Sequence, residues 1–191
     1  SNVDMKTGAP AFGTPEYMRA TQVSGQMARR YGLPLRASNA CAANAPDAQA
    51  AWESAFSLWA SVSAGVNMVY HAAGWLEGGL CASYEKFVMD ADFCGALHSY
   101  LAGVVVDDNS LALDAFKEVG VGKHFLGCAH TMENYQTAFW DSDIADNEPF
   151  EKWEIAGRTD AATRANARWK RMLVDYQAPA MDEATDEALI D

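Results

Sequence analysis

The feature that most constrains the fold is a pattern of helix, glycine and short apolar run that occurs twice. The first copy is the helical pattern at 15–31, Gly32 and the run at 33–38, and the second is the helical pattern at 47–64, Gly65 and the run at 66–72. A barrel of about 250 residues with eight repeats spends about 31 residues on each unit, and the two runs begin one such unit apart. The repeat therefore predicts neighbouring parallel strands joined by a crossover helix, with the loops at 39–46 and 73–83 on the same face.

Local signals mark the predicted helix starts. Thr14 followed by Pro15 is typical of a helix start, because threonine caps free backbone N–H groups and proline fits the first turn. Ser83 is a similar cap for a third predicted helix at 84–102. The three valines at 104–106 then predict a short strand.

After residue 106 the strand signal fades and helical patterns dominate. The predicted helices are 109–119, 131–140, 159–176 and 182–190, with an acidic loop at 141–149. Two or three strands cannot close an eight-stranded barrel. We therefore expect an α/β chain that forms the carboxyl-terminal part of a (β/α)8 TIM barrel, rich in helix and with few parallel strands. Residues 1–140 are expected to form the partial barrel, and residues 141–191 a helical carboxyl-terminal extension packed on it.

Composition argues against several classes of partner. The chain has 26 acidic and 14 basic side chains and a formal net charge of -12 at pH 7, which disfavours nucleic acid and anionic lipid. Residues 54–76 carry no charged side chain, but serines interrupt them and Gly65 divides them. They predict a buried helix and strand and no membrane span. Four cysteines without CxxC spacing and the lack of a secretory leader pattern favour a cytoplasmic protein.

Residues 66–92 have the layout of an active-site loop. A short apolar run leads to His71, which opens a glycine-rich stretch that contains one carboxylate, Glu77, just before the third predicted helix. In β/α folds, the loops at the carboxyl ends of the strands carry the chemistry. The sequence therefore predicts that this loop contributes to a binding or active site.

Several motifs occur together in the order found in one enzyme family. They are DMKTGAPAFGTPE at 4–16, YGLPLRA at 31–37, PDAQ at 46–49, WES at 52–54, HAAGWLEGGLCASYEKFVMD at 71–90, VGVGKHFLGCAHT at 119–131 and FEKWEIAGRTDAATRANARWK at 150–170. Together they resemble the trimethylamine methyltransferase family over nearly the whole chain, which is similar to the later portion of a full-length member. Members that use trimethylamine contain pyrrolysine, and this sequence has none. The chain is therefore more similar to the pyrrolysine-free subgroup that includes glycine betaine methyltransferases.

The resemblance implies a fold and a reaction. Family members are (β/α)8 barrels that move a methyl group from a methylated amine, such as glycine betaine or trimethylamine, to the Co(I) of a corrinoid on a separate small protein. The implied cofactor is thus the corrinoid (cobalamin) of a partner protein, with no cofactor and no metal bound by this chain itself. Because an open barrel leaves strand edges bare, we expect the chain to form a homo-oligomer and to be inactive by itself.

A quaternary amine makes simple demands on its site. Its nitrogen already carries the positive charge that makes it a leaving group, so the protein must supply position and a desolvated pocket. Aromatic faces bind such cations with about 0.5 to 2 kcal/mol each. A carboxylate on the substrate would bind a histidine or an arginine. The predicted substrate-binding residues are His71, Glu77, Trp75, Tyr70 and Arg36, with Phe12 and Phe125 as more distant candidates and with the catalytic residues unassigned.

Some of these residues have a structural alternative. His71 could be a satisfied structural histidine at a strand end. Glu77 could anchor its loop through backbone N–H groups. Trp52, Phe56 and Trp59 lie at helical spacing, which predicts that they belong to the core.

Two other functional classes are open. A non-catalytic module could use the same aromatic loop to bind a quaternary amine or a protein. A metal-dependent barrel enzyme would need a ligand cluster, and the spacing of Cys81, Cys94, His98 and Cys128 matches no known zinc frame.

The basic residues of the helix predicted at 159–176 form a solvated face or a docking surface for the corrinoid protein.

Overall fold

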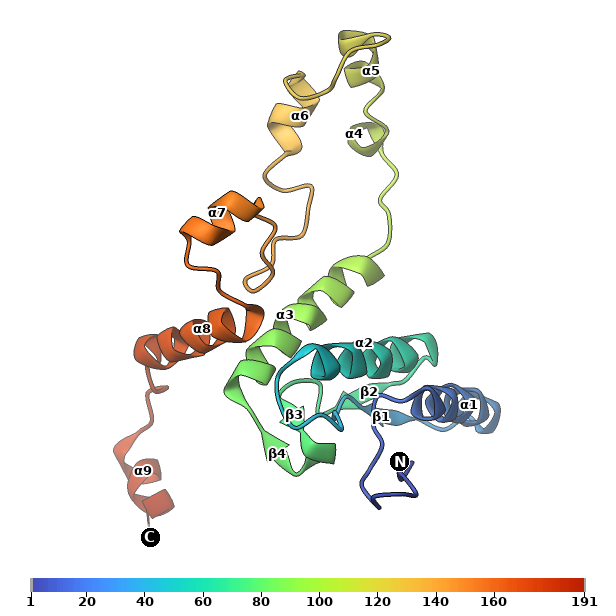
Figure 1. Cartoon of the computed structure of the whole chain (residues 1–191), viewed down its shortest axis with the longest axis vertical. Helices are drawn as coiled ribbons and strands as arrows, with labels where there is room; N and C mark the ends of the chain where they lie inside the picture. Colours follow the sequence, from blue (N-terminus) through green and yellow to red (C-terminus); the bar gives the residue numbers. More distant parts are fainter. Residues whose placement is uncertain (1, 191) are drawn as a thin grey trace.

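The structure, a computed structural model, describes residues 2–190, without the side chains of residues 183 and 190. The first group of elements is α1 (Pro15–Tyr31), β1 (Arg36–Ser38), α2 (Ala48–Ser63), β2 (Met68–Tyr70), β3 (Trp75–Leu76), η1 (Glu77–Gly79), β4 (Cys81–Ala82) and α3 (Tyr84–Leu101). The second is α4 (Asp108–Leu111), α5 (Leu113–Val119) and α6 (Ala129–Asn134), and the third is α7 (Phe150–Ile155), α8 (Ala161–Asp175) and α9 (Glu183–Ile190). Figure 1 shows α8 against α3, and the second group apart from both at the top. We call the first group with α8 the body, and residues 107–138 the distal lobe.

The strands of the repeat pair as predicted. β1 and β2 are parallel neighbours, with Arg36 opposite Met68 and Ser38 opposite Tyr70. The chain between them is α2, the predicted crossover helix. Two strands do not make a barrel, and the described chain is an α/β structure rich in helix with few strands.

Capping at the helix ends confirms the local signals. The Thr14 hydroxyl accepts a hydrogen bond from the N–H of Tyr17, and the Ser83 hydroxyl accepts one from the N–H of Lys86. Gly32 adopts a φ of 67°, a left-handed conformation that favours glycine and closes α1. These helix boundaries therefore follow from short stretches of sequence.

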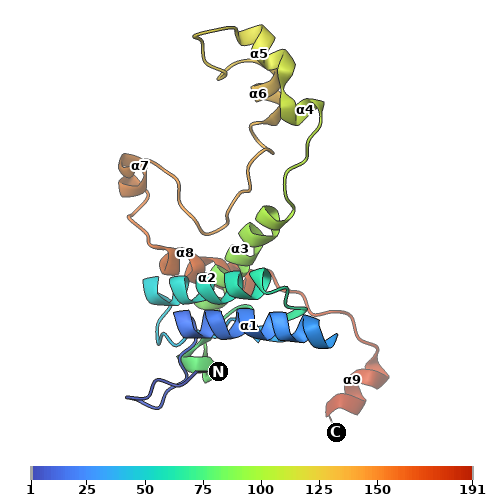
Figure 2. The ribbon, with the colours of Figure 1, turned by 90° about the vertical axis from the view of Figure 1, so that its right-hand side faces the viewer.

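α1 and α2 lie side by side (Figure 2) because small residues let them approach. Gly25 of α1 sits so close to the end of α2 that a Cβ atom there would lie 2.4 Å from the carbonyl oxygen of Ala64. No other residue type fits at that position without moving the backbone. The close approach brings α1 against the strands that α2 connects.

The face of α2 that packs inward is largely polar, which corrects the expectation from its aromatic residues. Trp52, Phe56 and Trp59 are 54%, 42% and 44% exposed, although their spacing predicted core. The close approach of α1 and of the loops after the strands leaves room only for smaller side chains on the inner face. The buried side chains of α2 are Ala50, Glu53, Ser54, Ser57, Leu58, Ala60 and Ser61.

The glycine-rich loop after β2 contains a small hairpin that the sequence analysis did not predict. β3 and β4 pair antiparallel, with Trp75 opposite Ala82 and Leu76 opposite Cys81. The turn between them is η1, in which Gly78 has a φ of 64°. The hairpin gives Trp75 a defined place at the start of the loop.

α8 packs on α3 through apolar contacts and one carboxylate. Val88 of α3 forms a buried cluster with Ala165 of α8 and with Ile144 of the predicted acidic loop. The Glu85 carboxylate accepts hydrogen bonds from Asn166 Nδ2 over 2.6 Å and from Trp169 Nε1 over 2.8 Å. These two bonds lower the pKa of Glu85 to about 2. Hydrogen bonds to a carboxylate therefore hold α8 on α3, in addition to apolar burial.

The distal lobe and the connection that leads to it depart from the sequence prediction in three places. Residues 104–106 form an exposed connection where a strand was predicted, because no strand edge in the described part of the chain lies beside them. The helix predicted at 109–119 is split into α4 and α5 by Ala112, which has a φ of 50°. The helix predicted at 131–140 ends at Asn134.

No helix within residues 2–190 is both long enough and apolar enough to cross a membrane.

Candidate functional site

The loops that follow β1 and β2 meet at the carboxyl ends of the two strands. The N–H of Cys41 donates to the carbonyl of Trp75 over 3.3 Å, and the N–H of Gly78 donates to the carbonyl of Cys41 over 2.7 Å. A further bond runs from the N–H of Glu77 to the carbonyl of Ala43. The two loops form one surface, which confirms the prediction that they emerge on the same side.

Arg36 and Tyr70 lie on the same face of the two-stranded sheet. Ser38 is the partner of Tyr70 across the sheet, and it lies two residues after Arg36, so the three side chains share a face. The guanidinium carbon of Arg36 lies 4.6 Å from the centroid of the Tyr70 ring, within the range of a cation–π contact. One face of Tyr70 is thus already covered by a cation of the protein.

His71 connects this pair to Trp75. Its φ of 53° is left-handed, which is uncommon for a residue other than glycine. Its Nδ1 lies 3.0 Å from the hydroxyl of Ser38. Its ring centroid lies 6.1 Å from that of Tyr70 and 5.2 Å from that of Trp75, both edge to face. Arg36, Tyr70, His71 and Trp75, four of the five predicted residues, therefore form one row of contacts, which we call the aromatic row.

A hollow of about 440 Å3 opens beside the aromatic row. Arg36, Ser38 and His71 line it together with Phe12 and Tyr17, whereas Tyr70 and Trp75 do not. The rings of Phe12 and Tyr17 meet edge to face at 5.3 Å. Phe12, a distant candidate in the sequence, thus lies beside two of the predicted residues.

Tyr17 and Ser38 are residues of this hollow that the sequence analysis missed. The Tyr17 hydroxyl donates to the carbonyl of Ser38 over 2.9 Å and accepts from the N–H of Ser38 over 3.2 Å. Burial raises the pKa of Tyr17. Ser38 could have been found from its place at the end of a predicted strand. Tyr17 has no such signal, because only the fold brings α1 to that strand.

Two predicted residues lie outside the aromatic row. Glu77 joins the two loops through its backbone N–H, which donates a hydrogen bond to the carbonyl of Ala43. Its side chain is exposed. That contact agrees with a loop-anchoring role, while substrate binding by the carboxylate stays a prediction. Phe125 belongs to the distal lobe, where its ring lies 5.2 Å from that of Phe116.

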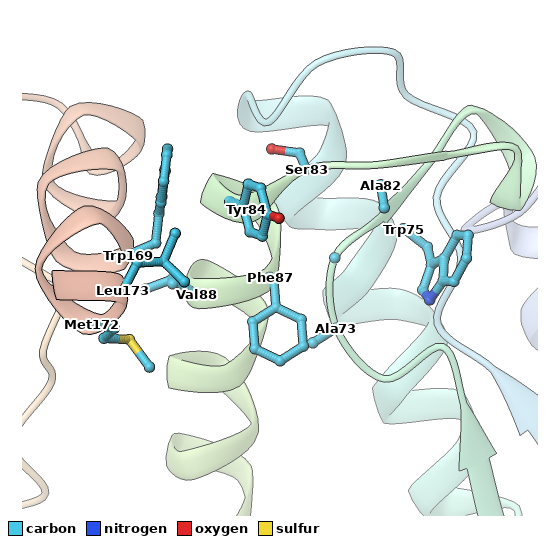
Figure 3. Close-up of a pocket in the computed structure, with 11 residues that line it drawn as sticks. Ala73, Trp75, Ala82, Ser83, Tyr84, Phe87, Val88, Trp169, Met172 and Leu173 are labelled. Atoms are coloured by element: carbon cyan, nitrogen blue, oxygen red, sulfur yellow. The ribbon is translucent and has the colours of Figure 1, made fainter. Parts of the chain in front are cut away.

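A larger hollow of about 610 Å3 lies between the hairpin, α3 and α8. Its wall is mostly apolar, and the stacked rings of Tyr84 and Trp169 are 4.9 Å apart. Figure 3 shows the Trp75 ring pointing away from Tyr84, Phe87 and Trp169. Trp75 is among the residues that line this hollow, and Arg36 is not. The smaller hollow is therefore the better candidate for a ligand that carries charge.

The cysteines and His98 do not assemble a metal site. Cys81 is exposed on the hairpin, Cys94 is half-buried on α3, and Cys128 is buried in the distal lobe. Across residues 2–190, no three His, Cys, Asp or Glu side chains gather closely enough to hold a metal ion. The metal-dependent alternative thus lacks a ligand set among these residues.

The arrangement can bind a small molecule that carries both charges. The guanidinium of Arg36 and the imidazole of His71 can donate hydrogen bonds to a carboxylate. The ring of Phe12, which lines the same hollow, can face a quaternary nitrogen. Tyr70 is less available, because Arg36 covers one of its faces. The residues that line the hollow therefore offer hydrogen-bond donors for a carboxylate and an aromatic face for a cation.

Parallel strands, a crossover helix and a polar hollow at the carboxyl ends of the strands define a β/α protein with a candidate small-ligand site. Comparison with known proteins is more specific. The family model described as Trimethylamine methyltransferase (MTTB) matches residues 1–191. The chain therefore belongs to the trimethylamine methyltransferase family, which confirms the resemblance of its motifs.

Two relatives show how much of a full-length protein the chain represents. The chain is 36% identical over 187 residues to glycine betaine methyltransferase of Desulfitobacterium hafniense strain Y51, covering 97% of this chain and 39% of the relative. It is 30% identical over 182 residues to trimethylamine methyltransferase MttB of Methanosarcina barkeri, covering 94% of this chain and 36% of the relative. The chain thus spans little more than a third of the length of either relative.

Proposed function

We propose that this chain is part of a methyltransferase that moves a methyl group from a methylated or quaternary amine, such as glycine betaine or trimethylamine, to a Co(I) corrinoid protein. Its membership of the trimethylamine methyltransferase family supports the reaction class. The observation that carries the site is the aromatic row, in which Arg36, Tyr70, His71 and Trp75 meet at the ends of two parallel strands. The acceptor of the methyl group is a substrate held by the partner protein.

The chain's own residues would bind and orient the amine. In methyl transfer, the N–CH3 bond breaks, its electron pair stays on nitrogen, and the methyl group forms a bond to Co(I). A quaternary amine, or trimethylamine in its protonated form, leaves as a neutral amine, so no further proton has to be supplied to the nitrogen. The aromatic part of the site would hold the ammonium group in a dry environment, and Arg36 and His71 would fix the other end of the molecule.

This division of roles favours a substrate with a carboxylate. Arg36 lies over Tyr70 and would repel an ammonium group placed on that ring. An amine whose carboxylate pairs with Arg36 would instead place its ammonium group toward Trp75. Glycine betaine has both a carboxylate for Arg36 and an ammonium group for the aromatic part, whereas trimethylamine has no carboxylate.

Calorimetric titration of the full-length protein that contains this chain tests the site. Trp75→Ala should weaken the binding of both glycine betaine and tetramethylammonium by about 0.5 to 2 kcal/mol, the value of a cation–π contact. His71→Ala should weaken glycine betaine by about 1.5 to 3 kcal/mol, because a hydrogen bond to a charged group is lost, and should hardly affect tetramethylammonium. Equal losses for the two ligands would make His71 structural. An unchanged affinity after Trp75→Ala would remove the aromatic site.

Trp52→Ala is the matched control for the tryptophan variant, since Trp52 is exposed on α2 and outside the aromatic row. Methyl transfer to free Co(I) corrinoid separates the enzyme from its alternative. A protein that binds the amine and transfers no methyl group would be a non-catalytic binding module.

The proposal extends to the arrangement of the whole protein. We place β1 and β2 in a (β/α)8 barrel, with residues 1–140 as part of that barrel and 141–191 as an extension packed on it. The packing of α8 on α3 supports the second part. The unpaired edges of a two-stranded sheet favour self-association and inactivity of the isolated chain. Robust methyl transfer by a monomer of these 191 residues would contradict this arrangement.

A further inference from the structure

A charged pair lies buried beneath the loop that carries His71 and Trp75. Lys86 and Asp90, one turn apart on α3, are only 1% and 3% exposed and form an ion pair. Charged residues are almost never fully buried unless they are paired, and a buried pair by itself is a weak source of stability. The place of this pair in the fold therefore suggests a role beyond stability.

Asp90 uses both oxygens of its carboxylate. Its Oδ2 accepts a hydrogen bond from the N–H of Gly74 over 2.9 Å. Its Oδ1 accepts one from the Ser54 hydroxyl over 3.0 Å and another from the Lys86 ammonium. Lys86 also donates to the Ser54 hydroxyl over 2.6 Å. The carboxylate thus ties α2 and α3 to the residue that directly precedes Trp75.

Gly74 is the point at which the chain turns from β2 into the hairpin. Its φ of 89° is open to glycine and strained for other residues, and a Cβ atom there would lie 3.1 Å from Phe87 Cβ. Its carbonyl accepts from the N–H of Ser83 over 3.0 Å, while its own N–H goes to Asp90. The direction in which the chain continues to Trp75 is therefore set by these two bonds.

We propose that Asp90 and Lys86 are positioning residues. Asp90 holds Gly74 so that the Trp75 ring contacts His71. Lys86, together with Ser54, holds the Asp90 carboxylate in place. The consequence for amine binding rests on the proposed function. The consequence for the loop does not, because it follows from the hydrogen bonds alone.

Hydrogen exchange in the variant Asp90→Asn tests the effect on the loop. An amide has one oxygen, so its NH2 group must face either the Gly74 N–H or the Lys86 ammonium. Peptides covering residues 72–76 should exchange at least about tenfold faster, the factor expected when a hydrogen bond to a charged acceptor is lost. Peptides of α1 should exchange as in the wild type. Wild-type exchange at residues 72–76 would overturn the proposal.

Leu97→Ala is the control for general destabilisation, because Leu97 is buried on the same helix, two turns beyond Asp90. It should lower the unfolding temperature without selectively accelerating residues 72–76. The same loop response in Leu97→Ala would overturn the proposal. Ser54→Ala, which removes only the shared hydroxyl, is the milder variant in case Asp90→Asn does not fold. It should also accelerate hydrogen exchange at residues 72–76, by a smaller factor than Asp90→Asn. Wild-type exchange rates at these residues in Ser54→Ala would count against the proposal.

Kinetics of the full-length protein with glycine betaine test the effect on the substrate. Asp90→Asn should lower kcat/KM by up to about 100-fold, the cost of a misplaced contact far from the chemistry, mainly through a higher KM. Leu97→Ala should change only the active fraction, and therefore kcat. Faster loop exchange with an unchanged KM would overturn the positioning role and leave the proposed function standing. A wild-type protein that neither binds nor demethylates amines would refute the proposed function, and the exchange data would still decide the role of Asp90 in the loop.

Discussion

The body and the distal lobe differ in what holds them together. In the body, the buried charged groups Glu53, Lys86 and Asp90 form hydrogen bonds to elements far away in the sequence. In the distal lobe, large apolar side chains such as Phe116 and Leu126 are exposed. Two extended connections join the lobe to the rest of the chain (Figure 2). The buried core of the lobe is Ala115, Val119 and Cys128.

The difference shows which kind of interaction can fix a site. Hydrogen bonds are directional, and in a dry interior a group left without its partner is costly, so they hold a loop in one conformation. Contacts between small apolar side chains are not directional, so a region held by them can unfold locally at a low cost in free energy. The aromatic row belongs to the region that is fixed by directional contacts, although the distal lobe also contains aromatic residues.

The largest expected effect comes from breaking the buried ion pair. Lys86→Met leaves Asp90 charged and unpaired in the interior, which should lower the free energy of unfolding by about 3 to 5 kcal/mol. The matched substitution in the distal lobe is Lys117→Met, where the ion pair with Asp114 is exposed and should contribute little to stability. Urea unfolding of the two variants at pH 7 measures both. Similar losses would mean that the two regions do not differ as the burial suggests.

The double variant Lys86→Met/Asp90→Asn separates charge from packing. It removes both charges and keeps an oxygen that can accept from Gly74. Most of the stability lost in Lys86→Met should return. A double variant as unstable as the single one would show that the lysine acts through its packing.

An intermediate effect is expected at the contact between α3 and α8. Because hydrogen bonds from Asn166 and Trp169 lower the pKa of Glu85 to about 2, from its ordinary 4.5, the ionised form is favoured in the folded state. The stability that it contributes is therefore fully present above pH 4.5 and is lost as the pH falls toward 2. The difference in unfolding temperature between wild type and Glu85→Gln should shrink over that interval. A difference that stays constant over that interval would contradict the role of these two hydrogen bonds.

The smallest expected effect lies in the distal lobe, and it is a stabilisation, whereas the preceding substitutions destabilise the protein. Ala112 has a φ of 50°, a left-handed conformation that is unfavourable for alanine. Ala112→Gly should relieve that strain and stabilise the lobe by less than about 1 kcal/mol, since glycine also gains entropy in the unfolded chain. Ala115→Gly, inside α5, should destabilise by about 1 kcal/mol. Hydrogen exchange rates of the α4 and α5 amides test both variants. A change of exchange rate in the same direction for the two variants would contradict the strain at Ala112.

Local sequence was sufficient for α1, α2, α3 and the parallel strands of the body, and insufficient for its hairpin and for the chain after α3. Thr14, Gly32 and Ser83 mark helix ends through bonds to their own neighbours, so three helices of the body were predicted almost to the residue. The valines at 104–106 needed a partner strand, which local sequence does not supply. The break at Ala112 has no signal at all, because alanine is the best helix former.

The membership of the candidate site was predictable in part, since Tyr17 and Ser38 were missed, and its geometry was not predictable. The loop after the second predicted strand led to Tyr70, His71 and Trp75, and the need of a substrate carboxylate led to Arg36. The structure brings these four residues together. The pairing of Arg36 with Tyr70 was not predicted, and it changes which part of a ligand that arginine can meet.

By itself, the sequence determined the parallel strands, the ends of three helices, the loops that carry the site and the family to which the chain belongs. These depend on caps, glycines and periodic patterns that act over a few residues, or on motifs in a fixed order. Only the tertiary structure decided which face of α2 is buried, with the serines inside and Trp52 and Trp59 outside, and that Lys86 lies in the interior. Burial depends on which elements approach one another, and a charged or polar side chain can be buried only where partners distant in the sequence arrive to satisfy it.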